Sequence, residues 1–196
     1  ELHCLNTASG LLDVYGDVIV NEKLKSSSDS TNTSLRFREV KTLTIGSDVK
    51  TTALSDLYAL NLRHSNGTID LPELTTQRVI LASTTNCTAR ATGDLTITEM
   101  IQLSTGRTFD ANGKTITSKE VDLNNTATFT LGAGSLVLTD NSQGFKSESG
   151  SVLNAGPGCT IGGDDSGQKV PFQSQNGFQI VGNIDDLNVT NEELTV

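Results

Sequence analysis

The chain has 196 residues and a formal net charge of −9, because 23 acidic residues outnumber 14 basic ones. This balance argues against binding a nucleic-acid backbone or an anionic membrane, since both require clustered Lys and Arg. Hydrophobic residues make up 35% of the chain, Trp is absent, and no run reaches the roughly 20 apolar residues of a membrane-spanning helix. These proportions are sufficient for the thin core of a solenoid, which grows by stacking coils.

Residues 1–42 are predicted to form an N-terminal coil or cap. Within 12–20, apolar residues occur in pairs at i and i+2, as in short strands with one inward face. Residues 26–34, SSSDSTNTS, are polar throughout and are expected to loop out before the main stack. Because the chain starts at Glu1 rather than Met, we expect either a processed N-terminus, as in a secreted protein, or a trimmed sequence.

A repeat of apolar pairs defines residues 43–168, which are predicted to form the main stack. Each pair occupies positions i and i+2, so its side chains point to the same side of a strand. Successive second members are separated by 17, 19, 22 and 20 residues, which is in the range of one solenoid coil. The pairs are Leu43/Ile45, Leu60/Leu62, Val79/Leu81, Ile101/Leu103 and Val121/Leu123.

Further apolar positions follow the later pairs at offsets of about 8 and 15 residues, so each coil of about 20 residues is predicted to carry three strands. Asn112-Gly113 and similar corners supply residues that tolerate positive φ. The pattern continues from Phe145 through Val152 to Cys159/Ile161. The positions that follow the series are Ala89/Ala91 and Leu95/Ile97, then Phe109 and Ile116, then Phe129/Leu131 and Leu136/Leu138.

Residues 169–196 break the coil pattern and are predicted to form a C-terminal cap and an acidic tail. The apolar residues within 172–181 are expected to make a capping strand or a hairpin, because an open solenoid end needs cover. The acidic end, residues 183–196, is expected either to remain a tail or to pair as a strand with a neighbouring molecule.

Together these elements predict an all-β, right-handed parallel β-helix. A leucine-rich repeat is disfavoured, because its Leu-x-x-Leu-x-Leu motif and any amphipathic stretch of helical length are missing. A β-sandwich or jelly roll stays open as the alternative, because it also separates short strands by turns every 8–12 residues or so. The shortness of the strand pairs and the triplet that recurs in register favour the β-helix.

Four stretches carry the coil pattern most clearly: GLLDVYGDVIVNEKL, VKTLTIGSDV, NGKTITSKEVDLNN and FTLGAGSLVLTDNSQG. Over residues 10–165 the chain resembles the secreted parallel β-helices of filamentous adhesins, autotransporter passengers, viral fibres and pectate-lyase-like enzymes. The resemblance implies the fold and an extracellular location. It includes no family-specific motif, so function has to be inferred from individual sites.

The cysteines Cys4, Cys87 and Cys159 lie too far apart in sequence to form a metal-binding motif, and neither a metal nor a cofactor is expected. Two interpretations of these cysteines stay open. A secreted chain can form one disulfide with a leftover thiol, or Cys87 and Cys159 can be buried as small apolar residues. N-glycosylation sequons, in a number close to chance expectation, begin at Asn32, Asn66, Asn86, Asn124 and Asn188.

The motif Gly162-Gly163-Asp164-Asp165 resembles the paired aspartates of polygalacturonase-like enzymes, which makes Asp164 and Asp165 weak catalytic candidates. No Asn-x-Asp precedes this motif, and the Gly-His-Gly and Arg-x-Lys motifs expected with it are missing, so a turn is the favoured interpretation. No Gly-x-Ser-x-Gly elbow supports serine hydrolysis. A lyase would need carboxylates grouped on one face, whereas the sequence disperses them at Asp94, Asp110, Glu120 and Asp122.

Surfaces for two other ligand classes are weakly supported by the residue pattern. Only Tyr15 and Tyr58 are candidates for an exposed aromatic platform that would bind a sugar. A regular Thr array of the kind that binds ice is expected to be broken by mixed outward residues, namely Gln102, Lys119, Glu120 and Asp122.

The sequence thus predicts a non-catalytic, extracellular structural or adhesive β-solenoid, and its sequons are compatible with a glycoprotein. We expect it to self-associate into a filament, fibre or oligomer, or to bind an extracellular surface partner, without nucleic acid or a membrane span. The alternative function is a polysaccharide-active enzyme of the pectate-lyase or polygalacturonase type.

Overall fold

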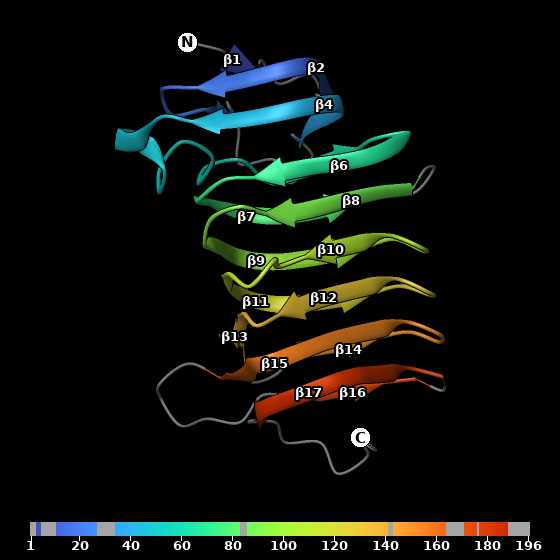
Figure 1. The fold of residues 1–196 in the computed structure, drawn as a ribbon. Helices are drawn as coiled ribbons and strands as arrows, with labels where there is room; N and C mark the ends of the chain where they lie inside the picture. Colours follow the sequence, from blue (N-terminus) through green and yellow to red (C-terminus); the bar gives the residue numbers. More distant parts are fainter. Residues whose placement is uncertain are drawn as a thin grey trace.

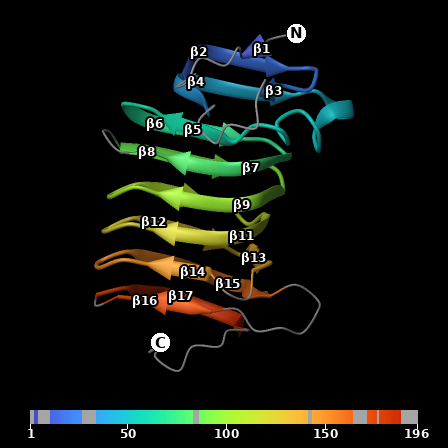
Figure 2. The same cartoon turned by 180° about the vertical axis from the view of Figure 1, so that it is seen from behind.

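The computed structural model describes residues 3–4, 11–26, 34–82, 86–140, 143–163, 171–175 and 177–187. Within these residues every strand pairing is parallel, and the helical content is one 3-10 turn, η1 (Ser47–Val49). Figure 1 shows the coils stacked as one rod from the N-terminal to the C-terminal end. In Figures 1 and 2 the strands nearest the viewer run from right to left as the chain descends, so the coil is right-handed.

Each coil crosses three faces, which we name A, B and C in the order in which the chain visits them. Long strands serve two faces: β7, β9 and β11 pass from face C to face A, and β15 and β17 pass from face B to face C. Figure 1 looks onto face B and Figure 2 onto face A.

The strands of face A are, in spatial order, β2 (Leu11–Val20), β4 (Ser34–Ile45), β5 (Ala59–Arg63), β7 (Leu74–Leu81), β9 (Leu95–Leu103), β11 (Thr115–Leu123), β14 (Gly144–Ser147) and β16 (Phe172–Ser174). Face B adds β6 (Asn66–Leu71), β8 (Asn86–Ala91), β10 (Thr108–Asp110), β12 (Thr128–Gly132), β15 (Val152–Gly163) and β17 (Gln179–Leu187). Face C adds β13 (Ser135–Leu138). A separate two-stranded sheet joins β1 (His3–Cys4) to β3 (Lys25–Ser26).

The core consists of inward side chains that stack directly on one another from coil to coil. On face B, Phe109 and Phe129 are register partners, and their rings stack with centroids 5.0 Å apart. On face A, Phe145 stacks on Phe172 at 4.4 Å. All four side chains are fully buried. Because the inward rows alternate with outward polar residues, a chain with few hydrophobic residues still buries a continuous core.

Corner residues permit the close stacking of coils. At the predicted corner Asn112-Gly113 both residues have positive φ, 51° and 72°. A Cβ atom on Gly156 would lie 2.4 Å from the carbonyl oxygen of Gly132 in the coil above. Only glycine allows the two backbones to approach this closely.

The structure confirms the parallel β-helix and its three strands per coil, and the uniformly parallel pairing excludes a sandwich or jelly roll. The predicted register is also correct where two predicted coils meet: Phe129 pairs with Phe109, and Leu136 stacks over Ile116. One member of the series was wrong. Leu43 pairs with Val18 on face B, and Leu35 takes the place above Leu60 on face A.

The physical reason for this error is that β4 crosses two faces in one strand. Val40 is buried at the bend between Phe37 and Leu43, so the strand presents two inward pairs in succession. The turns around η1 then lengthen this coil, so the residue that pairs with Leu35 on face A is Leu60.

At the C-terminal end the structure continues the stack. β16 pairs in parallel with β14, and β17 pairs in parallel with β15 as far as Leu187, so Phe172 and Ile180 belong to a further coil and not to a hairpin. At the other end, β2 pairs with β4 through both of its halves. The polar residues 27–33 and the tail beyond Leu187 lie outside the described residues.

Candidate interaction surface

The outward side chains of face A form a polar surface that carries both charges. On each strand of face A, one outward residue is the register partner of an outward residue on the next strand. Together these register partners form a single row of side chains, which we call row A. All members are half-buried except the exposed Gln173. From the first coil to the last, row A reads Asp13, Arg36, Asn61, Ile80, Gln102, Asp122, Lys146 and Gln173.

An arginine cluster occupies the N-terminal end of face A. Arg38 and Arg63 are direct register partners, and Arg36 lies beside them on β4. One carboxylate serves the group: Asp13 forms ion pairs with Arg36 and, at 3.2 Å, with Arg38. Burial lowers the pKa of Arg63, and the charges of Arg36 and Arg38 lower it further. The cluster therefore carries unbalanced positive charge on an otherwise acidic protein.

An acidic groove of about 240 Å³ occupies the opposite end of the same face. Lys146, which lines the groove, forms an ion pair with Glu120, and its Nζ lies 2.7 Å from Glu120 Oε1. Burial raises the pKa of Asp122, and the nearby charges of Glu120 and Glu148 act in the same direction. A hydrogen bond from Gln102 and the charge of Lys146 oppose the rise in pKa. The groove is lined by Asp122, Lys146, Ser147, Glu148, Gln173, Ser174 and Gln175.

The middle of face A is less charged. Ile80 and Met100 are half-buried on adjacent strands, β7 and β9. The Arg78 guanidinium lies 4.5 Å from the centroid of the Tyr58 ring and donates a 2.8 Å hydrogen bond to the Tyr58 hydroxyl. Tyr58 is thus occupied by Arg78 and does not form a free aromatic platform. Tyr15 is 60% exposed, but no other exposed aromatic ring accompanies it among the described residues.

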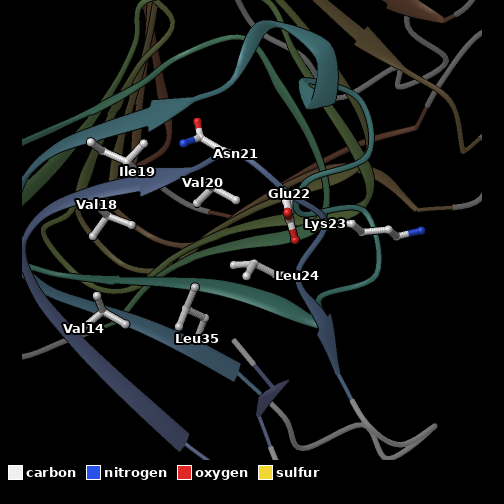
Figure 3. Close-up of a pocket in the computed structure, with 9 residues that line it drawn as sticks. All are labelled: Val14, Val18, Ile19, Val20, Asn21, Glu22, Lys23, Leu24 and Leu35. Atoms are coloured by element: carbon white, nitrogen blue, oxygen red, sulfur yellow. The ribbon is translucent and has the colours of Figure 1, made fainter. Parts of the chain in front are cut away.

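A second cavity, of about 360 Å³, lies at the N-terminal end of the core (Figure 3). Its apolar wall comes from the first coil, where the side chains of Val14, Val18 and Leu24 are only partly buried. Polar residues at its rim are Asn21, Glu22 and Lys23. The cavity marks where the first coil leaves the core incompletely covered among the described residues.

The acidic residues that are dispersed in the sequence are brought together only in part by the fold. The Asp94 carboxylate accepts a 2.9 Å hydrogen bond from the Thr115 amide, and that of Asp110 accepts one of 2.8 Å from the Asn112 amide, so both stabilise corners. Glu120 and Asp122, in contrast, project from one strand beside the acidic groove. Asp164 and Asp165 lie outside the described residues.

Threonines form a row that the sequence analysis did not expect. On face B, Thr68, Thr88, Thr108 and Thr128 stack in direct register. Gln102 and Asp122, which were expected to interrupt a row of threonines, lie on face A and not on face B. The expectation of a broken array was therefore wrong for face B, because residues from different coils can be aligned only when each coil length is known.

The neighbouring outward row of face B is charged. Arg90 forms two hydrogen bonds with the carboxylate of Asp70, its register partner, at 2.8 and 2.9 Å. Charged and hydroxyl rows thus run side by side on this face.

A cysteine, a histidine and a glutamate meet at the corner before β6. Glu39, which has a positive φ of 52°, accepts hydrogen bonds from the amide and hydroxyl of Ser65 at 2.6 and 2.9 Å. His64 Nδ1 lies 3.3 Å from Glu39 Oε2. Burial raises the pKa of the Cys87 thiol to about 11. At neutral pH this thiol is protonated, which does not suit a nucleophile. The hydrogen bonds between Glu39 and Ser65 stabilise the corner.

The remaining cysteine and sequon positions are distributed along the rod. Cys159 is buried, burial raises its pKa, and its thiol donates to the carbonyl of Asn183 at 3.2 Å. Neither Cys87 nor Cys159 is in a disulfide. Cys4 lies in β1.

Two sequon asparagines, Asn66 and Asn86, are exposed register partners at the starts of β6 and β8. Asn124 is half-buried. Asn32 and Asn188 fall outside the described residues.

In the described ranges, no three His, Cys, Asp or Glu side chains are grouped so as to hold a metal ion. The same ranges contain no helix of the length and apolar character needed to cross a membrane. Comparisons with protein-family models, with curated proteins and with solved structures gave no match.

Proposed function

We propose that this chain is a non-catalytic, extracellular structural or adhesive β-solenoid that assembles end to end into filaments or fibres. The observation that carries the proposal is the pair of open ends. Within the described residues β2 pairs only with β4, and β17 pairs only with β15, so each terminal coil keeps one unpaired edge. Unpaired parallel edges are templates for another chain.

The charge distribution supports head-to-tail contact. Residues 1–90 carry 9 basic and 10 acidic side chains, whereas residues 91–196 carry 5 and 13. The N-terminal half of the sequence is therefore nearly neutral, and the C-terminal half is strongly acidic. Head-to-tail contact avoids placing two acidic ends against each other, and a heterologous contact gives an open filament when the rotation does not close a ring.

Extracellular location is part of the same proposal. Its support is the resemblance to secreted adhesin-like and pectate-lyase-like β-helices, together with the exposure of Asn66 and Asn86, which leaves both sequons accessible to glycosylation.

Negative-stain microscopy and light scattering of the purified chain test the assembly. We expect rods that lengthen with protein concentration, because end-to-end contact is a reversible association. Compact monomers alone, in low salt and at all concentrations, would contradict end-to-end assembly. A chain shortened to end at residue 187 tests whether the tail contributes.

The acidic groove favours one second candidate, a polysaccharide-active enzyme. A carboxyl group with a raised pKa is suited to act as a general acid, and Asp122 has carboxylate neighbours in Glu120 and Glu148. A screen against neutral and acidic polysaccharides tests it. Turnover that is lost in Asp122→Asn but retained in Asp110→Asn would establish the enzyme and displace the structural proposal.

A further inference from the structure

We propose that face A is also a lateral contact surface, on which a second copy of this chain packs antiparallel about a two-fold axis at the level of β7. This contact uses the side of the rod, whereas the proposed function uses its ends. The two proposals can therefore hold or fail independently.

The argument starts from the order of side chains in row A. Ile80 is the fourth member, and the residues on either side of it mirror one another in chemistry. Asn61 and Gln102, both amides, flank Ile80 directly. One step further out, Arg36 stands on one side and Asp122 on the other.

The next step continues the pattern with opposite charge on both sides. Asp13 lies beyond Arg36, and Lys146 lies beyond Asp122. When the row is reversed, every cation therefore meets an anion, each amide meets an amide, and Ile80 meets its own copy. A surface that is complementary to its own reversed image is what a two-fold, isologous interface requires.

The geometry of the rod allows this match. A two-fold axis parallel to the strands reverses the rod and keeps the strand direction, so residues of row A oppose residues of row A. Coils repeat at about 4.8 Å in both copies, and facing sheets pack about 10 Å apart, so the levels coincide along the whole row. Figures 1 and 2 show successive strands lying nearly above one another, which keeps the row straight.

The two charged ends of face A also match as groups. The arginine cluster carries three guanidinium groups and one carboxylate, Asp13. Around the acidic groove, Glu120, Asp122 and Glu148 stand against one cation, Lys146. In the antiparallel arrangement each cluster faces the groove of the other copy. The centre between the charged ends holds Ile80 and Met100, and the Arg78 guanidinium there is held against the Tyr58 ring of its own chain.

The size of the surface sets the expected strength. Row A and its flanks cover an area of roughly 30 by 13 Å, or about 400 Å² per copy, given the usual strand spacing and rise. This is about half of what a standard stable interface buries on each partner. The dimer is therefore expected to be weak and sensitive to salt, and association has to be measured up to roughly 1 mM protein.

Sedimentation velocity of the full chain and of two charge-reversal variants, Arg36→Glu and Asp122→Lys, tests the proposal. Each variant alone is expected to dimerise at least roughly tenfold more weakly than the native chain, because a two-fold axis applies every reversal twice. Mixed together, the two variants are expected to regain dimerisation, because the glutamate introduced in one copy then faces the lysine introduced in the other. Unfolded chains would not restore association in this way, so the mixture also serves as a test of folding.

The matched control is Arg90→Glu, which reverses an exposed arginine of face B that also pairs with an aspartate. It is expected to dimerise like the native chain. Cross-linking supplies a second, independent measurement. Ile80→Cys is expected to link to itself through a short thiol cross-linker, whereas Gln102→Cys links only when mixed with Asn61→Cys.

Several results would overturn the proposal. These are a native chain that stays monomeric to roughly 1 mM in low salt, variants that dimerise normally, an equal loss in Arg90→Glu, or an Ile80→Cys chain that does not cross-link. Binding of a sulfated polysaccharide to the arginine cluster of a monomer that never dimerises would also reject it, and would assign face A to a polyanion instead.

Discussion

Replacement of Phe145 by alanine tests whether the aromatic side chains hold the lower coils together. Phe145 is fully buried, stacks on Phe172 at 4.4 Å, and meets Phe129 edge to face at 6.4 Å. It also contacts Phe178 at 6.1 Å. The substitution therefore leaves a cavity in the layer that connects the last coil to the coils above it on face A.

The expected loss of unfolding free energy is about 4 kcal/mol, within the usual range of 3–5 kcal/mol for a buried Phe→Ala change. Part of this loss comes from the ring pairs, which contribute about 0.5–1.5 kcal/mol each beyond burial. With a urea dependence of about 2–3 kcal/mol per molar, the unfolding midpoint should fall by roughly 1–2 M.

Urea unfolding followed by far-ultraviolet circular dichroism is the appropriate assay, because the chain has no Trp to report by fluorescence. Thr128→Ala, an outward and half-buried position on β12, is the matched control and should change stability by less than about 0.5 kcal/mol. A loss below about 1 kcal/mol for Phe145→Ala would refute the reasoning, because it would mean that the stacked rings do not carry the lower core.

Three further predictions follow from single features. Gly156→Ala should destabilise the rod by more than about 2 kcal/mol in the same urea assay, because its Cβ would lie 2.4 Å from the Gly132 carbonyl oxygen. Gly16→Ala is the control and should destabilise the rod less, because no atom lies within 4 Å of a Cβ placed there. The pKa of the Cys87 thiol is raised to about 11, so its contribution to stability is complete below the ordinary thiol pKa and is lost as the pH rises towards 11. The native protein should therefore lose stability from pH 9 to 11. Cys87→Ala should lose less over the same range. Expressed through a secretory pathway, the chain should shift in gel mobility after glycosidase treatment, and Asn66→Gln/Asn86→Gln should reduce that shift, whereas an unchanged shift would place the glycans elsewhere.

The sequence was sufficient to predict the inward side of the fold over most of its length. Val79/Leu81 and Ile101/Leu103 fall into register because apolar residues must face inward at every coil, which makes their spacing visible in one dimension. The prediction failed at Leu43/Ile45, where one strand bends across two faces and a longer coil follows. Periodicity alone does not distinguish two successive faces of one coil from the same face of two coils.

The outward surface was much less predictable. Arg36, Asn61 and Ile80 are neighbours in space only because the intervening coils have the lengths they do. A change in the length of any coil changes which outward residues become neighbours. Outward positions do not have to be apolar, so the sequence carries no pattern that shows these neighbours. The arginine cluster left one weak local signal, the alternation Arg36-x-Arg38, which places both side chains on the same side of a strand. The Thr row of face B was hidden for the same reason.

The unequal filling of the core makes both terminal coils of the rod easier to open than its middle. Val14 and Val18 are only partly buried at the N-terminal end, and so are Phe178 and Ile180 at the C-terminal end, whereas Phe109, Phe129 and Phe145 are fully buried in the coils between. In a solenoid each coil is stabilised mainly by its neighbours, so local opening begins where a coil gains least from the next one. A rod under tension would therefore open first at its terminal coils and extend gradually while its middle coils stay folded.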